Sequence, residues 1–362
     1  MLSRLTINST QTCNLGCKYC YAAGGDYGGP AIRISPSLAV EKLRQAAECH
    51  SIIKLVQFIG GEPLLNLSAM QAVAEEAVAL YEKGVLHERP AISAITNLTI
   101  LSDEHLRLFQ NYQFHLVVSL DGPSLVHNEL RPTKQGKGSF DDIVLNLQRI
   151  RECRIAFDIE CTYTYRHLES GLSIIDILKY LNEYDPGQID VVVVSTAPGD
   201  QLGFNEYGRW RDAVRLQLDA LNFSLDELEY GRIVPYGLLI ETLGQIRAPG
   251  TDNFCPAGVT NLAIASDGDL YQCNMFTNNP RYKTSIEAND EVITKSQITE
   301  CRKCWARPWC RSCVGNMEIR SPGDPHPYLQ HCETLRGAIS IVAQRLPGAL
   351  ESALQTVSQT IA

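Results

Sequence analysis

Cysteine is the residue type in this chain whose number and spacing could do chemistry, with 13 copies among 362 residues. Three of them, Cys13, Cys17 and Cys20, follow the spacing C-x3-C-x2-C near the N-terminus. An odd number of cysteines cannot pair fully as disulfides, and no apolar segment typical of a secretory signal precedes them. Thiolates are soft ligands that select zinc, copper(I) or iron–sulfur clusters. The cysteines therefore predict metal or cluster binding rather than a disulfide framework.

The segment Cys13-Asn-Leu-Gly-Cys17-Lys-Tyr-Cys20 resembles the cysteine motif of the radical S-adenosylmethionine (SAM) superfamily, with Tyr19 where that family usually has an aromatic residue. The resemblance implies a [4Fe–4S] cluster held by three thiolates, with SAM bound to the fourth iron through its amino and carboxylate groups. It also implies that an electron from the cluster cleaves SAM to a 5′-deoxyadenosyl radical. The alternative is a zinc site, which usually has four ligands in paired C-x2-C units. An isolated three-thiolate motif fits zinc poorly, so the cluster is favoured.

Further segments resemble the parts of this family that bind SAM. The tetrapeptide Gly60-Gly61-Glu62-Pro63 resembles the GGE motif, whose backbone and carboxylate hold the SAM amino group, and glycine lets the main chain approach a ligand closely. In relatives, residues that end the third and fourth strands, and an arginine that follows, lie in the cofactor region. The alternatives are a plain turn at the glycines and a surface salt bridge at the arginine. The resemblance implies a SAM-binding set of Gly60, Gly61, Glu62, Asn97, Ser119 and Arg131.

The first two hundred residues alternate between apolar, β-rich runs and amphipathic stretches, which predicts a parallel sheet with right-handed crossovers. Six strand–helix units are too few for a closed eight-fold barrel. They predict an α/β fold with an open, partial (β/α)6 barrel, whose functional loops lie at the C-terminal ends of the strands. The predicted strands are 4–8, 53–59, 91–96, 114–119, 156–163 and 189–194, and the predicted helices are 37–48, 67–83, 103–111, 140–151, 172–183 and 206–221.

The fifth predicted strand has a polar and an apolar face. Asp158, Glu160 and Thr162 share one face because side chains alternate along a strand. Two interpretations are equally compatible with this pattern: a lumen that contains SAM and substrate, or a solvated edge.

A second group of cysteines follows residue 254, with the pattern C-x12-G-x4-C, then C-x2-C-x5-C-x2-C and a final cysteine. It resembles the SPASM domain, an extension of radical SAM enzymes that modify peptides and proteins. The last pair departs from the family, which has x3 where this chain has x2, and this puts the geometry around Cys313 in doubt. The seven cysteines are Cys255, Cys273, Cys301, Cys304, Cys310, Cys313 and Cys332.

The SPASM resemblance implies two auxiliary [4Fe–4S] clusters, and therefore three in the whole chain. Cys301, Cys304, Cys310 and Cys332 would hold one. Cys255, Cys273 and Cys313 would hold the other, whose fourth position is open, bound by substrate, or filled by an oxygen ligand such as Asp252. Two structural zinc sites are the alternative. The cysteines left over are Cys49, Cys153 and Cys161.

These patterns predict four regions along the chain. Residues 1–205 form the radical SAM partial barrel, and 206–250 form a helical bridge that ends at the breaker Ala248-Pro249-Gly250. Residues 251–345 form the C-terminal SPASM cluster-binding domain, with a final helix at 335–344. Residues 346–362 form a loosely held tail.

The composition restricts the partners. The net charge of −9 leaves no excess of lysine and arginine for phosphates, which argues against nucleic-acid binding. No apolar stretch approaches the length of a membrane span, so no membrane partner is expected and the default location is the cytoplasm.

The resemblance favours a ribosomal-peptide maturase, similar to enzymes that form thioether or carbon–carbon (cyclophane) crosslinks and to spliceases that excise tyramine. Anaerobic sulfatase-maturating enzymes carry a catalytic Asp directly after the Cys of the G-x4-C element, where this chain has Asn274. An amide cannot act as a general base, so this position counts against sulfatase maturation. Modification of a folded protein or a small molecule, and a non-catalytic metal-binding scaffold, are the alternatives.

The expected partners are a precursor peptide and a reductant such as flavodoxin or ferredoxin. The first strand begins near residue 4, which leaves no room before it for a leader-binding domain. A separate leader-binding protein or direct recognition of the precursor is therefore expected.

Overall fold

The computed structural model describes residues 1–204, 208–248, 250–288, 292–324 and 326–346. The chain divides into two compact units. Unit 1 comprises Met1–Leu120, His127–Phe157 and Pro256–Val292, and unit 2 comprises Asp121–Val126, Asp158–Cys255 and Ile293–Ala362. In the part of the chain that the structure describes, no helix is long and apolar enough to cross a membrane.

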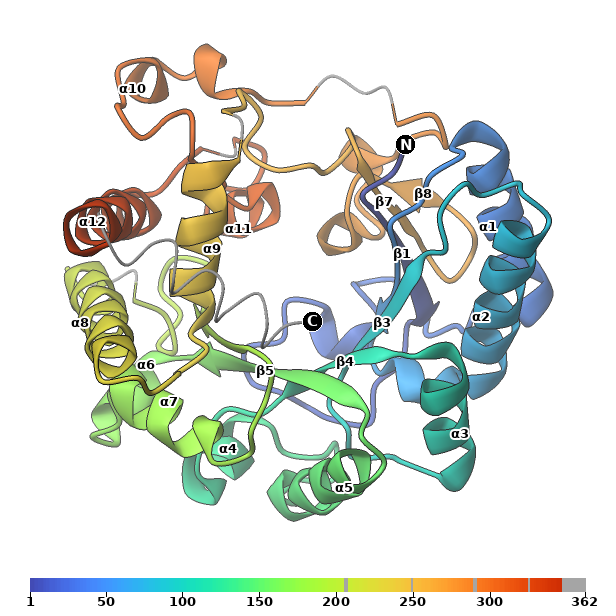
Figure 1. Cartoon of the computed structure of the whole chain (residues 1–362), viewed down its shortest axis with the longest axis horizontal. Coiled ribbons are helices and arrows are strands. Elements are labelled where there is room, and N and C mark those ends of the chain that lie inside the picture. The colour runs from blue at the N-terminus through green and yellow to red at the C-terminus, as the bar shows by residue number, and fades with distance from the viewer. Residues whose placement is uncertain (205–207, 249, 289–291, 325, 347–362) are drawn as a thin grey trace. The chain divides into compact units, whose positions relative to one another are not determined.

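Unit 1 is built from strands that alternate with helices. Figure 1 shows α1, α2 and α3 along one side of its strands. The elements are β1 (Arg4–Thr10), α1 (Pro36–Cys49), β2 (Leu55–Gly60), α2 (Leu67–Glu82), β3 (Ala91–Thr96), α3 (Asp103–Tyr112), β4 (His115–Ser119), α5 (Phe140–Glu152), β7 (Asn261–Ile264) and β8 (Leu270–Tyr271).

The strands of unit 1 have the linear order β4-β3-β2-β1-β7-β8. β1 to β4 are parallel to their neighbours, with Leu5 opposite Val56 and Val56 opposite Ile92. β7 is also parallel to β1, and β8 is antiparallel to β7. Because the carboxyl ends of parallel strands meet at one edge of a sheet, the loops after β1, β2, β3 and β4 gather at that edge.

β1 is the central strand of this unit, with a partner on each side. Leu5 and Ile7 are fully buried, and so are Asn8 and Thr10 near its carboxyl end. A buried polar group costs free energy unless it is hydrogen-bonded, and Asn8 Nδ2 donates to Thr277 Oγ1 at 2.7 Å. The buried polar end of β1 leads directly into the Cys13 loop.

Unit 2 combines a short parallel pair with a group of helices. β5 (Ala156–Tyr163) pairs with β6 (Ile189–Val193), with Ile159 opposite Ile189. α12 (Leu329–Arg345) packs on α8 (Trp210–Glu229) and α9 (Gly237–Arg247). The remaining helices are α4 (Ser124–Leu130, shared between the units), α6 (Tyr165–Glu169), α7 (Ile174–Asn182), α10 (Thr299–Arg302) and α11 (Val314–Arg320).

The predicted α/β fold with an open parallel sheet is confirmed, and all six predicted strands are present with boundaries that shift by two residues or fewer. The final helix was predicted too short, because α12 begins at Leu329 and includes Cys332. The helix predicted at 206–221 begins on residues outside the described part, and its described portion, α8, extends to Glu229. Pro249 of the predicted breaker and the tail after residue 346 also lie outside the described residues.

Candidate functional site: a cysteine loop and a four-thiol cavity

The Cys13–Cys20 loop follows β1 and is fixed by backbone hydrogen bonds to the segment after α4. Gly16 N donates to Pro132 O at 2.8 Å, and Lys18 N donates to Leu130 O at 2.9 Å. Arg131 lies between these two acceptors and donates from Nη1 to Tyr19 Oη at 2.6 Å. Arg131 is only 8% exposed, so it does not have the surface position that the alternative considered for it requires.

The Cys13 thiol is half-buried and already accepts hydrogen bonds. Leu15 N donates to Cys13 Sγ at 3.4 Å, and Asn97 Nδ2 lies 3.7 Å from the same sulfur. Burial raises the pKa of Cys13 to about 11. Because metal ligation requires the thiolate, cluster assembly at this site must release protons. N–H groups aimed at a ligating sulfur are a common feature of iron–sulfur sites and influence their potential.

Glu62 is the one carboxylate of the predicted SAM-binding set, and it is only 1% exposed. Its Oε1 accepts from Thr96 Oγ1 at 2.6 Å and from Leu64 N at 3.1 Å, and its Oε2 accepts from Asn97 N at 2.7 Å. Burial raises the pKa of Glu62, and these hydrogen bonds oppose the shift. A carboxylate has about four acceptor positions, so three internal donors leave one for a ligand.

The backbone of the Gly60–Glu62 turn lies against the residues that lead into the cysteine loop. Gly61 N donates to Thr10 O at 2.8 Å, and Glu62 N donates to Thr12 O at 2.9 Å. A Cβ on Gly61 would lie 2.1 Å from Thr12 O, and a Cβ on Gly60 would lie 2.1 Å from Thr10 O. Glycine is therefore required at both positions for the close approach of the two chain segments.

We expect Gly61→Ala to displace the Cys13 loop and to remove the iron of one cluster, roughly four iron atoms per chain. The reason is steric, because the added Cβ would lie 2.8 Å from Cys13 N as well as against Thr12. The measurement is iron content after anaerobic reconstitution. Gly244→Ala in α9 is the matched control, because nothing lies within 4 Å of its Cβ position. Full iron content in Gly61→Ala would contradict this account of the turn.

Asn97 and Ser119 stand at the carboxyl ends of β3 and β4, on the same edge as the cysteine loop. The Asn97 side chain donates to Asn14 Oδ1 at 3.0 Å and accepts from Thr99 Oγ1 at 2.6 Å. It therefore holds the cysteine loop, and its contact with SAM stays a prediction. Ser119 is 8% exposed and ends β4. Sequence analysis missed Asn14, which lies within the cysteine motif, and Thr99, which lies two residues after Asn97.

A second group of thiols lies in unit 2. Four cysteines of the SPASM-like pattern line one cavity of about 820 Å³. Burial raises the pKa of Cys310 to about 12 and that of Cys332 to about 11. Arg336, one helical turn after Cys332 on α12, approaches Cys304 Sγ to 3.9 Å with its Nη1. The four are Cys301, Cys304, Cys310 and Cys332.

Residues 7–181 match the Radical SAM superfamily. This range contains the cysteine loop, the glycine turn and Arg131. The chain carries a radical SAM domain. A cysteine-type anaerobic sulfatase-maturating enzyme of Clostridium novyi (strain NT) is 22% identical over 364 residues, covering 92% of this chain and 93% of the relative.

Solved structures resemble the fold of the radical SAM domain and of the residues that follow it. Native anSMEcpe with bound AdoMet matches with a TM-score of 0.78 at 18% identity, covering 97% of this chain and 99% of that chain. Streptococcus suis SuiB bound to precursor peptide SuiA matches with a TM-score of 0.61 at 18% identity, covering 89% of this chain and 74% of that chain. The predicted partial barrel with a SPASM-type extension is therefore confirmed at the level of fold.

The three-thiolate auxiliary set outside the radical SAM domain is divided between the units. Cys255 and Cys313 belong to unit 2 and Cys273 belongs to unit 1, so this set stays a prediction. Among the described residues, no group of three or more His, Cys, Asp or Glu side chains converges enough to hold one metal ion. All 13 cysteines lie in the described residues, and none forms a disulfide.

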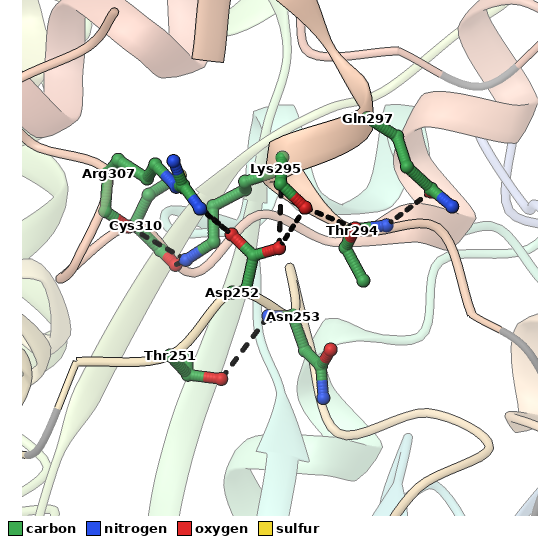
Figure 2. A network of polar contacts seen from close by, with 9 residues as sticks. Thr251, Asp252, Asn253, Thr294, Lys295, Gln297, Arg307 and Cys310 are labelled. Carbon is green, nitrogen blue, oxygen red and sulfur yellow. Dashed lines mark hydrogen bonds and ion pairs between the residues drawn. The ribbon is translucent and has the colours of Figure 1, made fainter. Parts of the chain in front are cut away.

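Asp252, considered as an oxygen ligand for that set, is already engaged. Figure 2 shows its carboxylate beside Arg307 and the segment that begins at Thr294. Oδ1 accepts from Arg307 Nε at 3.0 Å, and Oδ2 accepts from the backbone N–H of Ser296 at 3.2 Å and from its hydroxyl. These contacts hold the pKa of Asp252 at about 2. Iron ligation would break this ion pair, so the structure argues against Asp252 as an iron ligand.

The two interpretations of the fifth strand are distinguished at Glu160. Burial alternates along β5, as predicted, with Ile159 and Cys161 fully buried. Glu160 lines a cavity of about 350 Å³ in unit 2, together with Cys313 and Tyr328. Glu160 therefore lies at a cavity rather than at a solvated edge, and the presence of SAM and substrate in that cavity stays a prediction.

Proposed function

We propose that this radical SAM enzyme cleaves SAM to a 5′-deoxyadenosyl radical and abstracts hydrogen from a ribosomally made precursor peptide. The product would contain a crosslink, thioether or carbon–carbon, or would lack an excised backbone fragment. The observation that supports this proposal most is that the chain has both a Cys13 loop beside buried Glu62 and a separate cavity lined by four thiols. Similarity of fold to SuiB bound to its precursor peptide supports a peptide as the substrate.

In this proposal, Cys13, Cys17 and Cys20 hold the first [4Fe–4S] cluster, which when bound supplies the electron that cleaves SAM. The single remaining acceptor position of Glu62 binds the SAM amino group, and Thr96 and Asn97 N hold the carboxylate in place. Ser119 and Arg131 contact the ribose and carboxylate of SAM. Gly60 and Gly61 allow the backbone to approach the cofactor.

Two auxiliary clusters complete the proposal and bring the total to three. One cavity is lined by four thiols, which suits a cluster whose four irons each have a thiolate ligand. These thiols belong to Cys301, Cys304, Cys310 and Cys332. Cys255, Cys273 and Cys313 would hold the other cluster with one position open. A reductant such as flavodoxin or ferredoxin, and a separate leader-binding protein, are the further partners of this proposal.

A second candidate function is oxidation of a protein residue, as in sulfatase maturation. It is favoured by the similarity of nearly the whole chain to a sulfatase-maturating enzyme. Asn274 weighs against it, because its Nδ2 donates to Tyr21 Oη at 3.1 Å and an amide cannot accept a substrate proton as a base.

Anaerobic incubation with two peptides distinguishes the candidates. The reconstituted enzyme, SAM and a reductant are mixed with the precursor peptide encoded beside the gene, or with a sulfatase peptide that contains the target Cys or Ser. A change in mass of the precursor alone supports the proposal, and a change in the sulfatase peptide alone supports the second candidate. Formation of 5′-deoxyadenosine with neither peptide changed would reject both candidates. Absence of SAM cleavage together with far fewer than about 12 irons per chain would favour the non-catalytic scaffold.

A further inference from the structure

Lys295 is a buried ammonium beside the four-thiol cavity. It is 1% exposed and lines this cavity with Cys301, Cys304, Cys310 and Cys332. Its Nζ donates to the carbonyl oxygens of Arg307 at 2.8 Å and of Cys310 at 3.0 Å. Lys295 therefore contacts the backbone of one of the four thiol residues directly, as Figure 2 shows.

Among the described residues, Lys295 forms no ion pair with a carboxylate, although the carboxylate of Asp252, which pairs with Arg307, acts on it at longer range. Within the described residues, the ion pairs near the cavity join Arg307 to Asp252 and Arg336 to Glu333, and Lys295 has no such partner. Burying a charge costs several kcal/mol unless an opposite charge or good hydrogen bonds compensate. Two carbonyl oxygens satisfy two of the three N–H donors of an ammonium but carry no net charge.

A net negative charge in the cavity would provide that compensation. Four thiolates bring more negative charge than the oxidised core of a [4Fe–4S] cluster brings positive charge, and one-electron reduction adds another negative charge. An ammonium beside the cluster therefore stabilises the reduced state more than the oxidised state. The first site differs, because it has a buried carboxylate, Glu62, as well as the buried guanidinium of Arg131, and Asn97, whose N–H donates to Glu62, also approaches Cys13 Sγ.

We propose that Lys295 is a positioning residue that raises the reduction potential of the cluster held by Cys301, Cys304, Cys310 and Cys332, which makes this cluster the electron acceptor of the reaction. This role rests on the proposed function. A carbon radical that bonds to a thiol sulfur or an aromatic carbon must release one proton and one electron. The proton passes to a base or to solvent, and the cluster takes up the one electron and is reduced.

The test is a redox titration followed by electron paramagnetic resonance on the full chain, with Cys13, Cys17 and Cys20 replaced by alanine so that only auxiliary clusters contribute. Lys295→Met should make the reduction potential of this cluster more negative by at least about 59 mV, which is a tenfold change in the one-electron reduction equilibrium. Lys295→Arg keeps the charge and should stay within about threefold of the parent. Lys303→Met is the matched control, because Lys303 is exposed beside Cys304 and its charge is screened by water.

A second variant covers the case in which Lys295→Met assembles no cluster. Asp252→Asn removes the partner of Arg307, so the positive charge near the cavity rises and the potential should shift in the positive direction. Equal potentials in Lys295→Met and Lys303→Met would overturn the proposal, as would an unchanged or more negative potential in Asp252→Asn. These titrations contain no substrate, so they can succeed even where the peptide assay rejects the proposed function.

Discussion

Replacement of Cys13, Cys17 and Cys20 by alanine is expected to abolish SAM cleavage while the auxiliary iron remains. The three thiols follow β1 in unit 1, whereas the cavity of Cys301, Cys304, Cys310 and Cys332 lies in unit 2. Each site is built from its own unit, so loss of one should leave the other intact. The iron content should fall by roughly four atoms per chain, and 5′-deoxyadenosine should not form.

Cys49→Ala is the control for this prediction. Cys49 is an exposed thiol at the end of α1 and is not among the predicted ligands. It should keep both the iron content and the rate of SAM cleavage of the parent. Residual 5′-deoxyadenosine formation by the triple variant would show that another group of thiols supports the reaction.

Glu62→Gln is expected to weaken SAM binding at least about 30-fold, or about 2 kcal/mol, which is the lower range for truncating one partner of a buried charged pair. The substitution preserves shape but removes the negative charge, and it turns one oxygen into an N–H donor. That donor would then face Thr96 Oγ1 and Leu64 N, or Asn97 N, which all donate to the carboxylate now. An unsatisfied buried donor adds a cost of about 1–3 kcal/mol.

The measurement for Glu62→Gln is the dissociation constant of SAM, determined anaerobically by equilibrium dialysis. Glu75→Gln is the control, because Glu75 is exposed on α2 and, within the part of the chain that the structure describes, accepts a hydrogen bond only from Gln71 Nε2, at 2.8 Å. An unchanged dissociation constant in Glu62→Gln would mean that Glu62 only holds the turn and the β3 end together.

The strands that position the first site could be predicted because each is a β-rich stretch that alternates along the chain with an amphipathic helical stretch. β3 and β5 match the predicted ranges, and the loops after β1 and β2 carry the motifs at the expected edge. β7 was not predicted. Asn261–Ile264 is only four residues long and all four are buried, so it has no alternation that distinguishes a strand from a loop. Its strand character comes from pairing with β1, which is distant in sequence.

The burial and the hydrogen-bond partners of individual side chains could not be predicted from the sequence. Lys295 stands in a polar stretch and would be expected on the surface, yet it is buried against the carbonyl groups of Arg307 and Cys310. Asp252 was considered as an oxygen ligand for the set of Cys255, Cys273 and Cys313, but Arg307, 55 residues later, pairs with it. Such partners depend on the folded path of the chain, which residue spacing does not encode.

The proposal that one iron of a cluster at the Cys13–Cys20 loop has no protein ligand and binds SAM is tested most directly by electron paramagnetic resonance. The sample is the reduced, reconstituted enzyme with SAM labelled with nitrogen-15 at its amino group. The account predicts that SAM changes the signal of the first cluster and that a hyperfine coupling to the labelled nitrogen appears. Both effects should be absent in the Cys13, Cys17 and Cys20 alanine variant. A signal that SAM leaves unchanged, or a loop that contains zinc in place of iron, would contradict the account.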